Sequence, residues 1–130
     1  ETVDLNWHSP APFAEGKTLG EAFLTPTRIY VKDVLTAAKT GHIKAMAHIT
    51  GGGLTENLPR ILPAHLHAQV DETLWQTPAV FDWLQHTGKI TDADMHATFN
   101  MGVGMVLIGD DALKDHLPDE AFVIGKLHDA

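Results

Sequence analysis

The stretch that decides the fold runs from His42 to Asn57 and reads HIKAMAHITGGGLTEN. Its first half, residues 42–49, is mostly apolar and lies between Gly41 and the three consecutive glycines at 51–53, which predicts a buried or half-buried β-strand. After the glycines, the apolar residues up to position 62 fall on one helical face, with Pro63 beyond the end. The sequence therefore predicts a strand, a glycine turn and a helix in succession.

Hydrophobic periodicity and turn residues predict further elements on both sides of this unit. Helix 31–40 should bury Val34 and Leu35 against a sheet, and helix 79–85 should bury Val80, Trp83 and Leu84. Further strands are predicted at 42–49, 65–70, 103–108 and 121–127, with a short one at 2–6. Further helices are predicted from Thr18 to Pro26, from Thr91 to Phe99 (with Met95, Thr98 and Phe99 facing inward) and at 110–117, and residues 28–31 fit a strand or the start of the next helix. This alternation indicates an α/β or α+β class with one layered, mixed or mostly antiparallel sheet.

Composition narrows the range of functions. The 130 residues are 44% hydrophobic and show no internal repeat, which fits one globular domain. Nine Lys and Arg against 17 Asp and Glu give a net charge of −8, so nucleic acid and anionic membrane surfaces are poor partners. The absence of cysteine excludes disulfides, thiolate nucleophiles and Cys-ligated zinc. With neither a signal peptide nor a membrane-spanning run in view, we expect a cytoplasmic protein.

The glycine turn is the strongest candidate for a binding site. Three consecutive glycines favour positive φ or the close approach of a ligand, and the N–H groups that open a helix attract phosphate. Backbone amides would thus hold an anion in an acidic protein without added Lys or Arg. The alternative is a tight turn with no ligand. The stretch is neither a P-loop nor a GxGxxG motif.

Several side chains could complete such a site. Arg28 and Arg60 are the two arginines, and each could hold an anion bidentately; alternatively each is a surface residue or pairs with Glu21 or Glu56. His48 borders the turn and could act as a general acid or base or as a hydrogen-bond donor. The nine histidines lack the convergent spacing of a zinc site, so we expect no metal here.

Five motifs in order resemble the C-terminal half of the phosphoribosylformylglycinamidine cyclo-ligase (aminoimidazole ribonucleotide synthetase) family. The resemblance spans residues 18–108, and Ala45 departs from it where a glycine is expected. The motifs are PTRIYVK at 26–32, IKAMAHITGGG at 43–53, ENLPR at 56–60, WLQ at 83–85 and TFNMGVGM at 98–105.

The resemblance implies a fold, a reaction and partners. The fold would be a three-layer α/β/α domain with a mixed, mostly antiparallel sheet, partly ferredoxin-like. Residues 18–130 would form the substrate-side domain and residues 1–17 an extended leading segment or interdomain linker. The reaction would use ATP to close the imidazole ring of formylglycinamidine ribonucleotide in purine biosynthesis. ATP and Mg²⁺ would bind mainly to an N-terminal domain outside these 130 residues, and the full protein would be a homodimer acting on a small phosphoribosyl substrate.

The resemblance also implies a set of site residues. His48 would be catalytic, and the substrate or its phosphate would contact Thr27, Arg28, Thr50, Gly51, Gly52, Gly53, Glu56, Asn57, Arg60 and Asn100. The 130 residues alone should be catalytically silent. Two alternatives stay open, a non-catalytic binding or dimerisation module of this fold, and a related ATP-dependent enzyme of the selenophosphate synthetase or thiamine-monophosphate kinase type.

Overall fold

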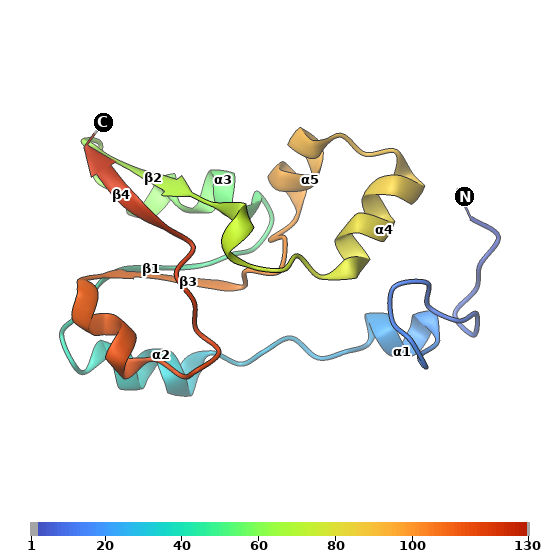
Figure 1. Ribbon diagram of the computed structural model, residues 1–130, viewed down its shortest axis with the longest axis horizontal. Coiled ribbons are helices and arrows are strands. Elements are labelled where there is room, and N and C mark those ends of the chain that lie inside the picture. Colours follow the sequence, from blue (N-terminus) through green and yellow to red (C-terminus); the bar gives the residue numbers. More distant parts are fainter. Residues whose placement is uncertain (1–2, 130) are drawn as a thin grey trace.

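The computed structural model describes residues 3–129, and the molecule is elongated (Figure 1). Helices α1 and α4 lie at one end, and two β-ribbons lie at the other. The elements are α1 (Leu19–Phe23), α2 (Val31–Ala38), β1 (Ile43–His48), α3 (Gly53–Asn57), η1 (Pro59–Ile61), β2 (Leu66–Val70), η2 (Glu72–Leu74), α4 (Ala79–Gly88), α5 (Asp92–Thr98), β3 (Met105–Gly109), η3 (Asp111–His116) and β4 (Gly125–Asp129).

The class is mixed α and β, as predicted, and all strand pairs are antiparallel among the described residues. The four long predicted strands form, but they do not share one sheet: β1 pairs with β3, and β2 pairs with β4. Met46 lies opposite Leu107 in the first ribbon, and Ala68 lies opposite Leu127 in the second. The prediction of a single sheet was wrong because strand patterns fix which face is apolar, not which edges pair.

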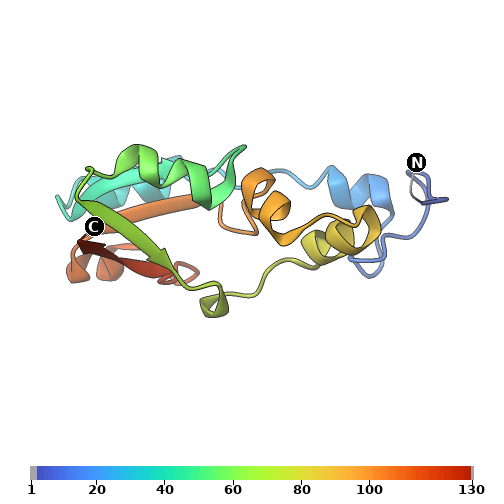
Figure 2. The same ribbon diagram turned by 90° about the horizontal axis from the view of Figure 1, so that it is seen from above.

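The two ribbons share one core. Its buried residues come from β1 and the segment after it, from the end of α3 and from β3: Ala47, Ile49, Leu58, Val103 and Val106. Ala68 and Val70 of β2, with Ile124 just before β4, pack against this cluster. Viewed from above, α3 lies along the β1–β3 ribbon beside this core (Figure 2). The strand–turn–helix unit is therefore anchored by apolar contacts on both sides of the glycine turn.

Three sequence expectations fail in detail. In α2 the inward residue is Ala37, with no exposed surface, whereas Leu35 is 55% exposed. Thr98 of α5 is exposed, although Met95 is fully buried as predicted. The last strand begins at Gly125 rather than at residue 121. An apolar position on a helix is buried only when another element covers that face, and the local pattern does not carry that information.

Two other predicted elements are shorter or absent. The helix expected over residues 54–62 divides into α3 and the 3₁₀ turn η1, whose first residue is Pro59. The strand expected at residues 2–6 does not form over the described residues 3–6, and its first residue lies outside them. Val80, Trp83 and Leu84 of α4 are half-buried rather than buried.

The segment before α1 packs through aromatic rings. Phe13 lies 5.1 Å from Trp83 of α4 and 5.4 Å from Phe23 of α1, between ring centroids. Pro10 forms an isolated bridge with Thr18, which begins α1 with a full capping box to Glu21. These contacts tie α1 to α4 at the end of the molecule away from the ribbons.

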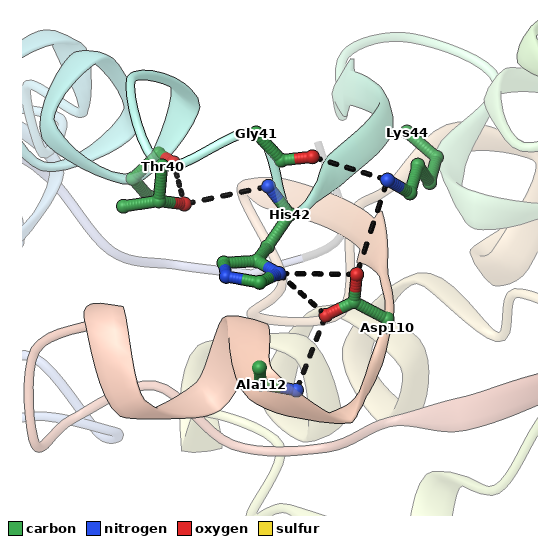
Figure 3. A network of polar contacts seen from close by, with 7 residues as sticks. Thr40, Gly41, His42, Lys44, Asp110 and Ala112 are labelled. Carbon is green, nitrogen blue, oxygen red and sulfur yellow. Dashed lines mark hydrogen bonds and ion pairs between the residues drawn. The ribbon is translucent and has the colours of Figure 1, made fainter.

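A polar network closes the outer end of the β1–β3 ribbon (Figure 3). His42 Nδ1 lies 2.9 Å from Asp110 Oδ1, and Lys44 Nζ donates to the carbonyl of Gly41 at 3.1 Å. The same Asp110 carboxylate accepts from the amide of Ala112 and so caps η3. The hydrogen bond from His42 is the main reason that the pKa of Asp110 lies below its usual value.

Along residues 3–129, no helix has the length and apolar character needed to cross a lipid bilayer.

Candidate functional site: the glycine turn and the neighbouring groove

The glycine turn forms where the sequence places it, between β1 and α3. The amide of Ile49 donates to the carbonyl of Gly104 at 2.9 Å, which extends the ribbon to the start of the turn. Gly52 and Gly53 then take positive φ values of +97° and +57°. Residues with a Cβ rarely adopt these angles, so the backbone itself requires glycine at both positions.

Close packing adds a second requirement at Gly53. A Cβ there would collide with the backbone carbonyl oxygens of His96 and Phe99, at the end of α5. At Gly52 a Cβ would instead meet the side chain of Glu56, and at Gly51 it would meet nothing within 4 Å. The third glycine is therefore fixed by helix packing, whereas the first lies open to solvent.

Asn57 holds the turn from inside. Its side chain is buried, and Nδ2 donates to the carbonyl of Gly53 at 2.7 Å. The same nitrogen lies 3.3 Å from the Gly51 carbonyl oxygen and 3.4 Å from that of Thr50. The structure thus places Asn57 behind the turn, where it orients the backbone rather than facing solvent.

Some backbone N–H groups of the turn donate hydrogen bonds within the protein, and others do not. The Gly53 N–H donates to the Thr50 carbonyl at 3.1 Å. Within residues 3–129, the N–H groups of Gly51 and Gly52 donate no hydrogen bond. These two donors, together with the exposed hydroxyl of Thr50, are the groups that could receive an anion.

Charge beside the turn is balanced. Arg60 donates to Glu56 at 3.0 Å in an i,i+4 ion pair, with both side chains more than half exposed. This is the pairing that the sequence left open as the alternative to ligand binding by Arg60. The Glu56 carboxylate lies next to Gly52 and would repel an anion bound there. Arg60 would attract that anion most strongly if its ion pair with Glu56 opened.

A second part of the site is a groove of about 390 Å³ on the outer side of β1. It brings together three of the predicted residues, Thr27, Arg28 and His48, although 20 positions separate Arg28 from His48. Arg28 donates to Asp33 Oδ2 at 3.1 Å, a partner that the sequence did not suggest. The remaining lining is largely apolar: Ile29, Tyr30, Val31, Val34, Leu35 and Met105.

Tyr30 is the residue of this groove that sequence reasoning missed. Its ring lies 6.2 Å from the ring of His48, and the Arg28 guanidinium lies 5.7 Å from the Tyr30 ring centroid. Its hydroxyl occupies the space that a side chain at Gly104 would need. No local pattern pairs Tyr30, just before α2, with Gly104, just before β3, because only the tertiary structure brings them together.

Asn100 lies in the other glycine-rich junction rather than in the groove. Its Oδ1 accepts from the Gly102 amide at 2.9 Å, and Met101 takes a positive φ of +49°. The indole N–H of Trp75 donates to the Met101 carbonyl at 3.0 Å. This junction carries the chain from α5 into β3, so Asn100 acts there on the backbone.

Acidic and histidine side chains are spread over the described residues rather than clustered. Within residues 3–129, no group of three or more His, Cys, Asp or Glu is arranged to hold a metal ion. The charged groups beside the turn, Glu56 and Arg60, neutralise each other. A triphosphate cradle needs free cations and metal-holding carboxylates together.

A comparison with known protein families matches residues 1–129 to the family described as AIR synthase related protein, C-terminal domain. The match covers nearly the whole chain, including the glycine turn, the groove and the segment before α1. The chain therefore belongs to the AIR synthase related family, as its C-terminal domain.

Proposed function

We propose that this chain is the substrate-side domain of a cytoplasmic, ATP-dependent cyclo-ligase. The full protein would convert formylglycinamidine ribonucleotide into aminoimidazole ribonucleotide, ADP and phosphate. The observation that carries the proposal is the family match over residues 1–129, since the superfamily consists of ATP-dependent enzymes. The motif order around the glycine turn favours the cyclo-ligase over its relatives.

The roles of the residues follow from where each lies. The free amides of Gly51 and Gly52 and the hydroxyl of Thr50 would receive an anionic group of the substrate. His48 and Arg28 line the groove beside the turn, where Arg28 would exchange Asp33 for the ligand. Gly53, Asn57 and Asn100 would fix the backbone that presents these donors.

ATP and Mg²⁺ would bind mainly to an N-terminal domain of the same protein, and the working form would be a homodimer. We therefore expect no ATP-dependent cyclisation by the 130 residues alone.

The test is steady-state kinetics on the intact protein that carries this domain. Purified protein is given ATP, Mg²⁺ and formylglycinamidine ribonucleotide, and aminoimidazole ribonucleotide and ADP are measured. Parallel reactions with selenide and with thiamine monophosphate test the related enzyme types. Product from either of these, with none from the ribonucleotide, would replace the cyclo-ligase by that relative. A well-folded intact protein that turns over none of the three would favour a binding or dimerisation module.

His48→Asn separates the two roles of the histidine. It keeps a hydrogen-bond donor but removes the imidazole ring. We expect kcat to fall by roughly 10²–10⁴-fold, the usual contribution of a general acid or base. An increase in KM with kcat unchanged would instead assign His48 to substrate positioning. Thermal melting of the variant controls for its folding.

A further inference from the structure

His96 of α5 bridges two elements through both of its ring nitrogens. Nδ1 lies 2.7 Å from the backbone carbonyl oxygen of Asp92, one helical turn earlier. Nε2 lies 2.8 Å from Glu72 Oε1 and 2.9 Å from Oε2, in the 3₁₀ turn η2. The imidazole side chain is one-third exposed, at 33%. Glu72 is 24 positions away in sequence, so this contact joins separate parts of the fold.

The chemistry of the two partners fixes the protonation state that makes this bridge. A backbone carbonyl and a carboxylate accept hydrogen bonds but donate none, whereas a neutral imidazole carries one N–H. Both contacts are hydrogen bonds only when the ring carries both protons. In agreement, the hydrogen bond to Asp92, followed by that to Glu72, raises the pKa of His96 above its usual value.

The charged groups around the His96 ring also favour its doubly protonated, positively charged form. Glu72 faces it from η2, and Asp92 adds a further negative charge from the previous turn of α5. Helix α3 meets the end of α5 through the backbone of Gly53, and its Glu56 is paired with Arg60. On α4, His86 makes its own contact within the helix, with Nδ1 2.8 Å from the Asp82 carbonyl oxygen.

The position of α5 matters because the glycine turn rests on it. The carbonyl oxygens of His96 and Phe99 occupy the space that a Cβ on Gly53 would need. Any displacement of the last turn of α5 therefore changes the surface that supports Gly53. Asn57 holds the turn from one side, and the end of α5 holds it from the other.

We propose that protonated His96 is a positioning residue for the glycine turn, because its bridge to Glu72 fixes the end of α5 against Gly53. Loss of one ring proton removes one of the two hydrogen bonds and loosens the support of the turn. Any effect of His96 on substrate binding rests on the proposed function. The effect of His96 protonation on the position of α5 and on the glycine turn does not.

The direction of the pH dependence follows from the raised pKa. The bridge contributes fully below the ordinary histidine pKa, about 6.5. Its contribution is lost as the pH rises through the raised pKa of the folded state. The turn should therefore be best ordered in mildly acidic solution and more mobile in alkaline solution.

The test uses nuclear magnetic resonance on the 130-residue chain and needs no ligand. The titration of each histidine ring and the exchange protection of the Gly53 amide are followed between about pH 5 and pH 9. Glu72→Gln removes the carboxylate charge but keeps the size of the side chain. His86→Gln is the matched control, since His86 makes the same contact to a carbonyl four residues earlier but belongs to α4.

In the wild type, protection of the Gly53 amide, corrected for intrinsic exchange, should fall about two- to fivefold as His96 loses its proton, the range for partly exposed charge pairs. In Glu72→Gln, His96 should titrate at lower pH, and the loss of protection should move with it. His86→Gln should leave both unchanged. An identical His96 titration in the wild type and Glu72→Gln would overturn the bridge. Protection that does not follow His96 would overturn its role in positioning the turn.

Discussion

Gly53 combines two constraints, a left-handed backbone and a contact with two carbonyl oxygens of α5, and both can be tested at the scale of one residue. A Cβ in the left-handed region and overpacking against backbone together cost about 3 kcal/mol. We therefore expect Gly53→Ala to lower the free energy of unfolding by about this amount in urea denaturation.

Gly51→Ala is the control for this comparison. It places the same methyl group two positions earlier in the turn, in open space and without a positive φ. Its free energy of unfolding should stay within about 0.5 kcal/mol of the wild type, as for most exposed substitutions. Equal losses in the two variants would show that α5 does not support the turn as described.

Asn57 is the buried polar residue whose loss should be felt most directly in the turn. Asn57→Leu removes the buried side-chain donor to the carbonyls of Gly53 and Gly51, whereas the Thr50 carbonyl keeps its bond from the Gly53 amide. Buried groups left unsatisfied cost about 1–3 kcal/mol each. We expect a loss in that range, together with faster exchange of the turn amides. Unchanged exchange in a folded Asn57→Leu variant would contradict the role given to Asn57.

At the scale of the element, α1 depends on its capping box. The Thr18 backbone amide and, to a lesser extent, its hydroxyl donate to the Glu21 carboxylate, and these bonds lower the pKa of Glu21. A lowered pKa stabilises the folded state above the ordinary glutamate value of 4.5, and this contribution is lost as the pH falls through the folded-state pKa. Circular dichroism and amide exchange should show α1 fraying first on acidification.

Thr18→Ala gives the same element a test at neutral pH. Loss of an N-cap hydroxyl usually costs about 1 kcal/mol. Thr25→Ala is its control, because Thr25 donates to the Glu21 carbonyl at the other end of α1 without touching the carboxylate. Because Thr18→Ala keeps the backbone hydrogen bond to Glu21, equal acid sensitivity in the variant and the wild type would show that the hydroxyl contributes nothing to it.

At the scale of the whole molecule, the two ribbons are held together by one shared core. Ile49 is 3% exposed within that core, whereas Ile29 is 79% exposed at the groove. Ile49→Ala should therefore cost about 2–5 kcal/mol, as for other buried large-to-small changes. Ile29→Ala should cost less than about 0.5 kcal/mol.

Both variants should unfold in a single transition by fluorescence and circular dichroism, since one core joins the ribbons. Two separate transitions in Ile49→Ala would show that the β1–β3 and β2–β4 ribbons are independent units. A large loss in Ile29→Ala would show that its exposed face is covered in solution.

The sequence by itself determined the local elements. Alternation and glycine boundaries placed β1, β2 and β3 to within a residue or two, and the Thr18 and Thr91 caps placed the starts of α1 and α5. The three glycines predicted the turn, and two of them do take positive φ. These features are local because backbone angles and capping bonds depend on residues only a few positions apart.

Tertiary structure alone decided how these elements meet. It separated the strands into two ribbons and brought Arg28 into the groove with His48. In α2 it buried Ala37 and left Leu35 exposed, although Leu35 was predicted to be buried. It also turned Asn57 inward and placed α5 against Gly53. Strand pairing and helix burial depend on which distant parts of the chain pack against an element. One apolar pattern is compatible with several such packing arrangements, so the sequence pattern alone does not choose between them.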